Sequence, residues 1–195
     1  MPIRTFPALL VALLLALALV ATPASLTAQA DAPLPDLPAE VTAAVSGKVA
    51  VITGTSSGLG FELAELAAQL GMKVVLADID LPPSAQLAEG IRAAGGEAVA
   101  VQVDLADPAQ RPRVLEVAVD RFGGVDYLFN NAGYAYATTL ELHDLDDAHR
   151  LFEVNYWAYV DLANRVVPIM RNRGGGTIVN TVSILGHRPA PPGWG

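Results

Sequence analysis

The chain has 195 residues, a formal net charge of −8 at pH 7 and no cysteine. This length suits one domain. The acidic balance argues against nucleic-acid binding, which uses basic patches, and the lack of cysteine excludes disulfides and cysteine-ligated metals. Metal-ligand spacing is also lacking among the three histidines, which are His143, His149 and His187. We therefore expect neither a nucleic-acid partner nor a metal site.

The first 30 residues have the order of a secretory signal peptide. Arg4 precedes an apolar run from Ala8 to Ala21, and Ala28-Gln29-Ala30 follows as a small-x-small cleavage site. The run is shorter than the ~20 residues that a membrane span needs, so a retained anchor at residues 8–21 is the alternative. We therefore expect the protein to be exported or to enter an endomembrane lumen. Residues 31–45 are expected to form a linker, because prolines recur in their first half.

The globular domain is expected to occupy residues 46–195, beginning with a strand over 48–53. That strand contains the short apolar run Val49 to Ile52, which is typical of a buried parallel strand. A helix is expected over 59–70, because Leu59, Leu63, Leu66, Ala67 and Leu70 follow the spacing of one helix face. Between strand and helix lies a glycine-rich turn.

Three glycines stand on this turn, at positions 54, 58 and 60. Gly54 can adopt a backbone conformation closed to other residues. Gly58 and Gly60 lack a Cβ, so a ligand and the neighbouring strand can approach the start of the helix. The free amides and the positive dipole end there suit a pyrophosphate. A glycine turn without a ligand is the alternative, but the flanking strand and helix favour dinucleotide binding.

Strands and helices then alternate along the chain. The expected elements are a strand at 73–78, a helix at 84–94, a strand at 98–103, a helix from Asp107-Pro108 to Phe122, a strand at 125–129, a long helix at 145–170 and a strand at 177–182. This alternation predicts an α/β fold of the Rossmann type, a doubly wound parallel sheet with helices on both faces.

Asp78 ends the second expected strand, 24 residues after Gly54. An acidic side chain there can accept hydrogen bonds from the adenosine ribose, and its charge repels a 2′-phosphate. No lysine or arginine lies in the glycine turn or directly after Asp78. The pattern therefore favours NAD over NADP, with a strand-end Asp that merely caps a turn as the alternative.

Five motifs in order make the chain resemble the short-chain dehydrogenase/reductase family. They are Thr53 to Gly60 as Thr-Gly-x-x-x-Gly-x-Gly, Asp104 after the third strand, Asn130-Asn131-Ala132-Gly133 after the fourth, Asn155 in the long helix and Ser183 after the fifth strand. The resemblance implies catalytic roles for Ser183 and for Asn155, which holds a helix kink and a water of the proton relay. It implies cofactor contacts from Gly54, Ser56, Ser57, Gly58, Leu59, Gly60, Asp78, Asp104, Leu105, Asn131, Ala132 and Gly133.

The family's acid/base pair, Tyr-x-x-x-Lys, is expected about a dozen residues after the Ser. The only lysines are Lys48 and Lys73, so the sequence contains no such pair. The expectation is an N-terminal part of a dehydrogenase, truncated after its fifth strand and inactive by itself, acting in complete form on a small alcohol or carbonyl. A non-catalytic NAD-binding module is the alternative. The family resemblance also suggests a homo-oligomer for the full protein. Tyr134 and Tyr136 are expected either to touch substrate or to pack within their loop.

Overall fold

The computed structural model describes residues 39–135 and 138–183. The chain divides into two compact units, Met1–Ser46 and Gly47–Gly195. In the first, residues 39–45 of the expected linker form a helix, α2 (Ala39–Val45). The signal-peptide residues and the proline-rich part of the linker lie outside the described residues. Within the described ranges, no helix is both long and apolar enough to cross a membrane.

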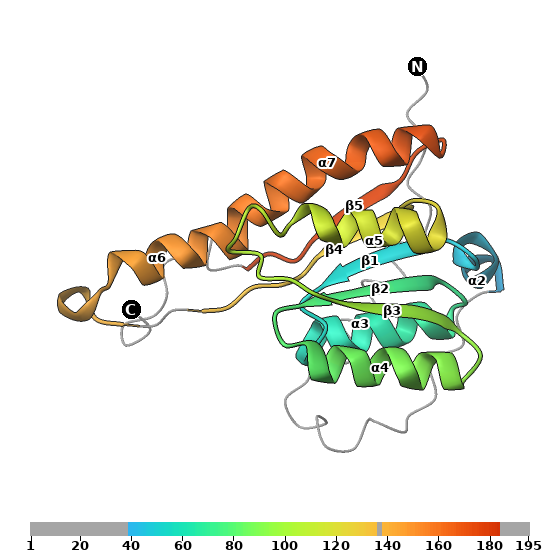
Figure 1. Cartoon of the computed structure of the whole chain (residues 1–195), viewed down its shortest axis with the longest axis horizontal. Helices are drawn as coiled ribbons and strands as arrows, with labels where there is room; N and C mark the ends of the chain where they lie inside the picture. The colour runs from blue at the N-terminus through green and yellow to red at the C-terminus, as the bar shows by residue number, and fades with distance from the viewer. Residues whose placement is uncertain (1–38, 136–137, 184–195) are drawn as a thin grey trace. The chain divides into compact units, whose positions relative to one another are not determined.

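The second unit is built on a parallel five-stranded sheet of order β3-β2-β1-β4-β5 (Figure 1). The strands are β1 (Val49–Thr53), β2 (Lys73–Asp78), β3 (Glu97–Gln102), β4 (Tyr127–Asn130) and β5 (Thr177–Asn180). The order reverses between β1 and β4, which places the topological switch point beside the strand that enters the glycine turn. The expected doubly wound Rossmann-type sheet is confirmed.

Helices cover both faces of this sheet, as expected. In Figure 1, α3 (Gly58–Gln69) and α4 (Leu81–Ala93) lie against one face, whereas α5 (Pro112–Phe122) and α7 (Ala158–Asn172) lie against the other. All five residues of β1 are buried, because this strand has a partner on each edge and a helix layer on each face. The apolar run that predicted the strand is the centre of the fold.

The register of the central strands brings β-branched and leucine side chains into one core. Val51 pairs with Val75 on β2 and with Leu128 on β4. These residues join Leu162 and Val166 of α7 in a buried cluster on the α5–α7 face. This core holds the strands in register. It therefore also fixes where the loops after their carboxyl ends begin.

Two helix starts differ from the expectation. The expected helix at Asp107-Pro108 begins instead at Pro112, because a proline inside a helix removes a backbone hydrogen bond and clashes with the preceding turn, whereas the first position tolerates it. Asp107 caps a separate turn by accepting from the Ala109 amide at 2.9 Å. Helix α4 begins at Leu81, earlier than expected, because its two prolines fall in the first turn.

The expected long helix is interrupted. It consists of α6 (Leu145–Phe152), a π-helical turn (Glu153–Trp157), labelled η2, and α7. A short 3₁₀ helix, η1 (Leu140–Leu142), precedes α6. The π turn contains Asn155, the residue expected at a helix kink, and π turns inside helices are frequent at functional sites.

Candidate cofactor-binding site

A cleft of 480 Å³ opens at the carboxyl ends of the strands. This edge is where open α/β sheets bind ligands, at the switch point of the strand order. Eleven of the twelve expected cofactor residues line the cleft: Gly54, Ser56, Ser57, Gly58, Leu59, Asp78, Asp104, Leu105, Asn131, Ala132 and Gly133. The fold thus brings together residues that are up to 79 positions apart, and their contact with a cofactor stays a prediction.

The glycine turn has the backbone that its residues suggested. Gly54 and Gly58 have φ of 76° and 56°, in the left-handed region that favours glycine. Gly60 does not line the cleft; a Cβ on it would collide with the carbonyl oxygen of Gly54. Its role is to let the helix start pack against the turn. Leu59, expected on the buried helix face, is instead 40% exposed and borders the cleft.

Asn131 ties the fourth strand to this turn. Its backbone amide donates to Thr53 Oγ1 at 3.0 Å, and its side-chain amide donates to the Thr53 carbonyl at 3.1 Å. Its side-chain oxygen accepts from the Thr181 hydroxyl at 3.2 Å. One side chain therefore holds the ends of β1, β4 and β5 in a fixed relation, which is what shapes this wall of the cleft.

Asp78 lies at the end of β2 and is 8% exposed. Its carboxylate accepts from the Ser56 amide at 2.8 Å and from the Asp80 amide at 2.9 Å. The turn-capping alternative is seen, because Asp78 caps the turn after β2 and also reaches the glycine turn, whereas its contact with a ribose stays a prediction. Each carboxylate oxygen can accept more than one hydrogen bond, so capacity remains for ribose hydroxyls.

Asp104 faces an arginine across the cleft. Its Oδ1 accepts from the Ala106 amide at 2.9 Å, and its Oδ2 lies 2.8 Å from an Arg150 guanidinium nitrogen on α6. The Asp104 carboxylate raises the pKa of Arg150 through this hydrogen bond and the opposite charge. The sequence interpretation missed Arg150. It also missed Val154, four residues later on the same helix side, together with Ala77, Ile79, Val103 and Thr181, which also line the cleft.

Asn155 makes a two-way hydrogen bond with the loop after β4. Its side-chain oxygen accepts from the Tyr134 amide at 3.1 Å, and its side-chain nitrogen donates to the Tyr134 carbonyl at 2.8 Å. Only this orientation of the amide satisfies both contacts. Gly133 gives Asn155 room here, because a Cβ on it would lie 3.2 Å from the Asn155 oxygen, a tight contact. Asn155 is therefore a partly buried, bonded residue and not a solvent-facing one.

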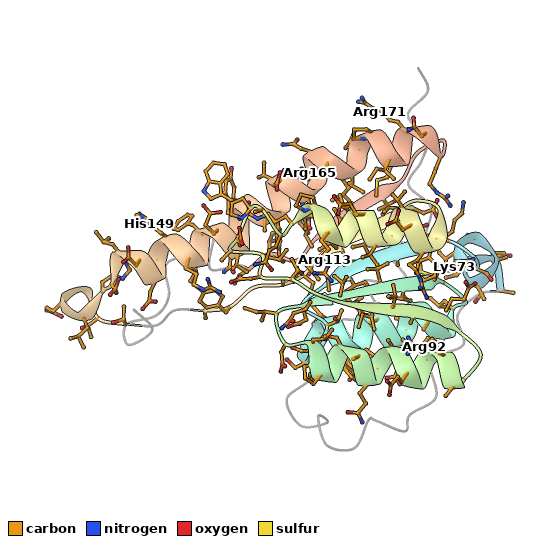
Figure 2. All side chains as sticks on the ribbon, viewed as in Figure 1. Lys73, Arg92, Arg113, His149, Arg165 and Arg171 are labelled. Atoms are coloured by element: carbon orange, nitrogen blue, oxygen red, sulfur yellow. The ribbon has the colours of Figure 1, made fainter. Side chains whose placement is uncertain are left out.

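The remaining expected residues are placed less completely. Ser183 follows β5 and is exposed, and it is not among the residues that line the cleft. Tyr134 borders the cleft and is 42% exposed, whereas Tyr136 lies outside the described residues. His149 lies on α6 (Figure 2). In the part of the chain that the structure describes, no group of three or more histidine or acidic side chains could hold a metal ion.

Tyr159 of α7 contacts the loops that follow β4 and β5 and was not singled out from the sequence. Its hydroxyl donates to the Ala132 carbonyl at 3.0 Å, with the Thr181 carbonyl at 3.4 Å. Burial raises the pKa of Tyr159 to about 12, so its hydroxyl keeps its proton at neutral pH. Because it lies between the ends of β4 and β5, it helps to hold these two strand ends together.

Comparison with known proteins identifies the family. Residues 48–194 match the short chain dehydrogenase family. Cyclohexanol dehydrogenase of an Acinetobacter species is 38% identical over 142 residues, which are 72% of this chain and 57% of that protein.

Solved structures give the same result. L-sorbose reductase from Gluconobacter frateurii, complexed with NADPH and L-sorbose, is 37% identical with a TM-score of 0.72, over 75% of this chain and 56% of that one. A short chain dehydrogenase/reductase from Burkholderia phymatum, in complex with NAD, is 39% identical with a TM-score of 0.71, over 75% of this chain and 52% of that one. The chain thus spans about half the length of the relatives it matches. It belongs to the short chain dehydrogenase family.

Proposed function

We propose that this chain is the dinucleotide-binding part of an oxidoreductase that transfers hydride between NAD and an alcohol or carbonyl compound. The observation that carries the proposal is the cleft itself, which gathers the glycine turn, Asp78 and the turn of Asn131 to Gly133 at the switch point of the sheet. The names of cyclohexanol dehydrogenase and L-sorbose reductase support a small alcohol or carbonyl as the substrate class.

The residues present fit a dinucleotide. A Cβ on Gly58 would meet no atom within 4 Å, so the space over the start of α3 is open. No side chain caps that helix start, which leaves its first amides available to a pyrophosphate. Asp78 would hold the adenosine ribose. When bound, NAD would supply the hydride acceptor for alcohol oxidation.

A preference for NAD over NADP rests on charge. The Asp78 carboxylate repels a 2′-phosphate, and the glycine turn offers no cation to offset it. Arg150 is the one cationic residue among those that line the cleft, and it is paired with Asp104. The structural relatives carry NADPH and NAD respectively, so the fold alone accepts either cofactor and Asp78 is the discriminating group.

Residues 1–195 lack the Tyr-x-x-x-Lys pair that would transfer the proton. In our proposal Ser183 binds the substrate oxygen and Asn155 holds a water of the proton path. Lys48 and Lys73 stand at the amino ends of β1 and β2, at the opposite edge of the sheet from the cleft. Tyr159 donates its hydroxyl proton to the Ala132 carbonyl, and burial raises its pKa to about 12. We therefore propose that residues 1–195 bind cofactor without appreciable turnover.

The test is NADH formation from a panel of secondary alcohols. The 195-residue chain is compared with a longer product, a version extended through the next in-frame segment, if that segment encodes Tyr-x-x-x-Lys. General acid–base catalysis typically contributes ~10²–10⁴-fold, so we expect the longer product to be faster by at least that order. Equal rates from both would contradict the proposal and require another base.

A non-catalytic NAD-binding module is the second candidate. It needs only the cleft, which already gathers the glycine turn, Asp78 and Asn131. Both candidates bind NAD, but only the first gains turnover in the longer product. If no in-frame extension encodes the pair and the chain still binds NAD, the module is the better description.

Location and assembly are also proposals. The order of charge, apolar run and Ala28-Gln29-Ala30 supports cleavage after Ala30. N-terminal sequencing of expressed protein should then find Asp31 first, whereas an uncleaved chain in the membrane fraction supports the anchor. Exposed Phe152, Tyr156 and Trp157 support a homo-oligomer, which sedimentation of the longer product would test.

A further inference from the structure

Arg111 is a buried arginine that the proposed function does not use. It directly precedes α5, and its side chain is only 4% exposed. A buried cation is strongly unfavourable unless it is paired and hydrogen-bonded. Arg111 meets this demand from the preceding loop and from the distant helix: its Nε donates to the Leu105 carbonyl at 2.8 Å, and one terminal nitrogen donates to the carbonyl and to the carboxylate of Glu153. Its other terminal nitrogen lies 4.0 Å from the Asp161 carboxylate on α7.

The two segments that Arg111 joins both belong to the candidate site. Leu105 lines the cleft beside Asp104. Glu153 is the first residue of the π turn, and its carbonyl already accepts from the Ala158 amide, the shifted bond that defines the turn. Arg111 thus places a second donor on the carbonyl where the helix ladder changes register. Insertion of a side chain into the ladder is a known cause of helix distortion.

The register of this turn decides where Asn155 lies. Asn155 is two residues after Glu153, and its side-chain amide reaches both main-chain groups of Tyr134. With regular α-helical bonding, the residues on either side of the turn would be rotated relative to each other. The pairing with Tyr134 and the close approach to Gly133 leave little room for that rotation.

We propose that Arg111 is a positioning residue: it fixes the π turn and thereby aims the Asn155 side chain at the loop after β4. Through the Leu105 carbonyl it also links Asn155 to the wall of the cofactor cleft. The value of this placement for catalysis rests on the proposed function, but the placement itself does not. A competing explanation is that Asn155 distorts the helix unaided, since Asn amides compete for backbone bonds.

The test follows the side-chain amide signals of Asn155 and Asn131 by ¹⁵N NMR in the full chain. Arg111→Met keeps an unbranched side chain but removes every donor. We expect the Asn155 amide to shift and to exchange its protons about fivefold faster, the change for loss of a hydrogen bond of about 1 kcal/mol. The Asn131 amide, bonded to Thr53, should not change. Arg113→Met is the matched control, because Arg113 is an exposed arginine two residues later, on α5 (Figure 2).

Two results would overturn the proposal. One is an Asn155 amide that stays unchanged in Arg111→Met, which supports distortion by Asn155 alone. The other is an equal change at Asn155 and Asn131, which means that Arg111 supports the whole unit rather than the turn. If Arg111→Met does not fold, Arg111→Lys decides, because a lysine keeps the charge but lacks the planar fork through which Arg111 donates to the Leu105 and Glu153 carbonyls. A shift at Asn155 alone supports the proposal, and no shift contradicts it.

These outcomes are separate from those of the proposed function. Titration with NAD reports on the cleft, whereas the Asn155 signals are read without cofactor. If the unchanged chain binds no NAD, the proposed function is overturned. If the Asn155 amide still shifts and exchanges faster in Arg111→Met, the positioning role of Arg111 stands.

Discussion

Two buried aspartates at opposite edges of the sheet, Asp126 and Asp78, are satisfied by different kinds of partner. At the amino edge, Asp126 is 6% exposed and accepts from the Val49 amide at 2.9 Å and from two nitrogens of Arg173, the nearer at 3.0 Å. At the carboxyl edge, Asp78 accepts only from backbone amides and lies at the wall of a cleft. Asp126 is thus paired with a cation, whereas Asp78 keeps its negative charge without one, although Asp104 at the same edge pairs with Arg150.

This difference separates groups that hold the fold from groups that serve a ligand. Asp126 links β1, the start of β4 and the end of α7, so its loss should act on stability. The open space over Gly58 and the spare acceptors of Asp78 contribute nothing to packing, which is expected of positions kept for a ligand. The variants below test this division.

The largest effect on stability is expected at the amino edge. Asp126→Ala leaves the Val49 amide and Arg173 without their acceptor and should lower the free energy of unfolding by about 3 kcal/mol. Burial alone would raise the pKa of Asp126, but its hydrogen bonds with Arg173 and Val49 outweigh burial and lower it. Its contribution is therefore present above about pH 4 and is lost as the pH falls through the lowered value.

Urea unfolding from pH 7 down to pH 3 measures this effect. Lys48→Met is the control, because the Lys48 nitrogen lies 3.9 Å from Asp126 and is half exposed; it should change stability by less than about 1 kcal/mol. An Asp126→Ala protein that remains stable but loses NAD binding would reverse the assignment of the two edges.

The next effect is expected in the glycine turn. Gly60→Ala forces a Cβ against the Gly54 carbonyl and should destabilise by about 1–3 kcal/mol, with loss of NAD binding, because the turn must move. Gly90→Ala on α4 is the control, since its Cβ meets nothing within 4 Å; it should stabilise the helix by up to about 1 kcal/mol. Thermal unfolding and calorimetry measure both. Unimpaired NAD binding in Gly60→Ala would show that the turn does not form the site.

The features that the sequence predicts well are those that short segments determine. The run Val49 to Ile52 predicts a buried strand wherever it stands, and three spaced glycines predict a tight turn. The helix start at Asp107 was predicted wrongly because a capping Asp and a proline occur there, while Pro112, five residues later, prevents a continuous helix.

The features that the sequence did not predict depend on contacts between distant segments. Arg150 bonds Asp104 across 46 positions, and Arg111 bonds Glu153 across 42. In the sequence, both arginines look like solvent-exposed residues of a helix surface. In the fold, however, Arg111 is among the most buried polar residues of the unit. Tyr159 looks like one aromatic residue of a helix until the ends of β4 and β5 lie beside its hydroxyl.

A smaller effect is expected on cofactor choice. Asp78→Asn removes the negative charge and should strengthen NADP binding relative to NAD by about tenfold. Asp80→Asn, an exposed carboxylate two residues later, is the control and should leave the ratio unchanged. Titration of each variant with both cofactors gives the ratio. An unchanged ratio in Asp78→Asn would remove Asp78 as the discriminating group.

The smallest effect is expected at Tyr159. Tyr159→Phe removes the hydrogen bond to the Ala132 carbonyl and should cost about 1 kcal/mol at pH 7. Burial raises the pKa of Tyr159 to about 12, so this contribution is full below about pH 10 and is lost as the pH rises through the raised value. Unfolding by urea between pH 7 and pH 11 measures the slope. Tyr156→Phe, at an exposed hydroxyl, is the comparison, and an identical alkaline slope in both variants would contradict the assignment.

The most direct test of the account is a titration of the ¹⁵N-labelled chain with NAD. We predict amide shifts at Ser56, Ser57, Gly58 and Leu105, which line the cleft, and none at Gly123 or Gly124 beside Arg173 at the amino edge. Shifts of equal size at both edges, or no shift at millimolar NAD, would contradict the assignment of the carboxyl edge as the cofactor site.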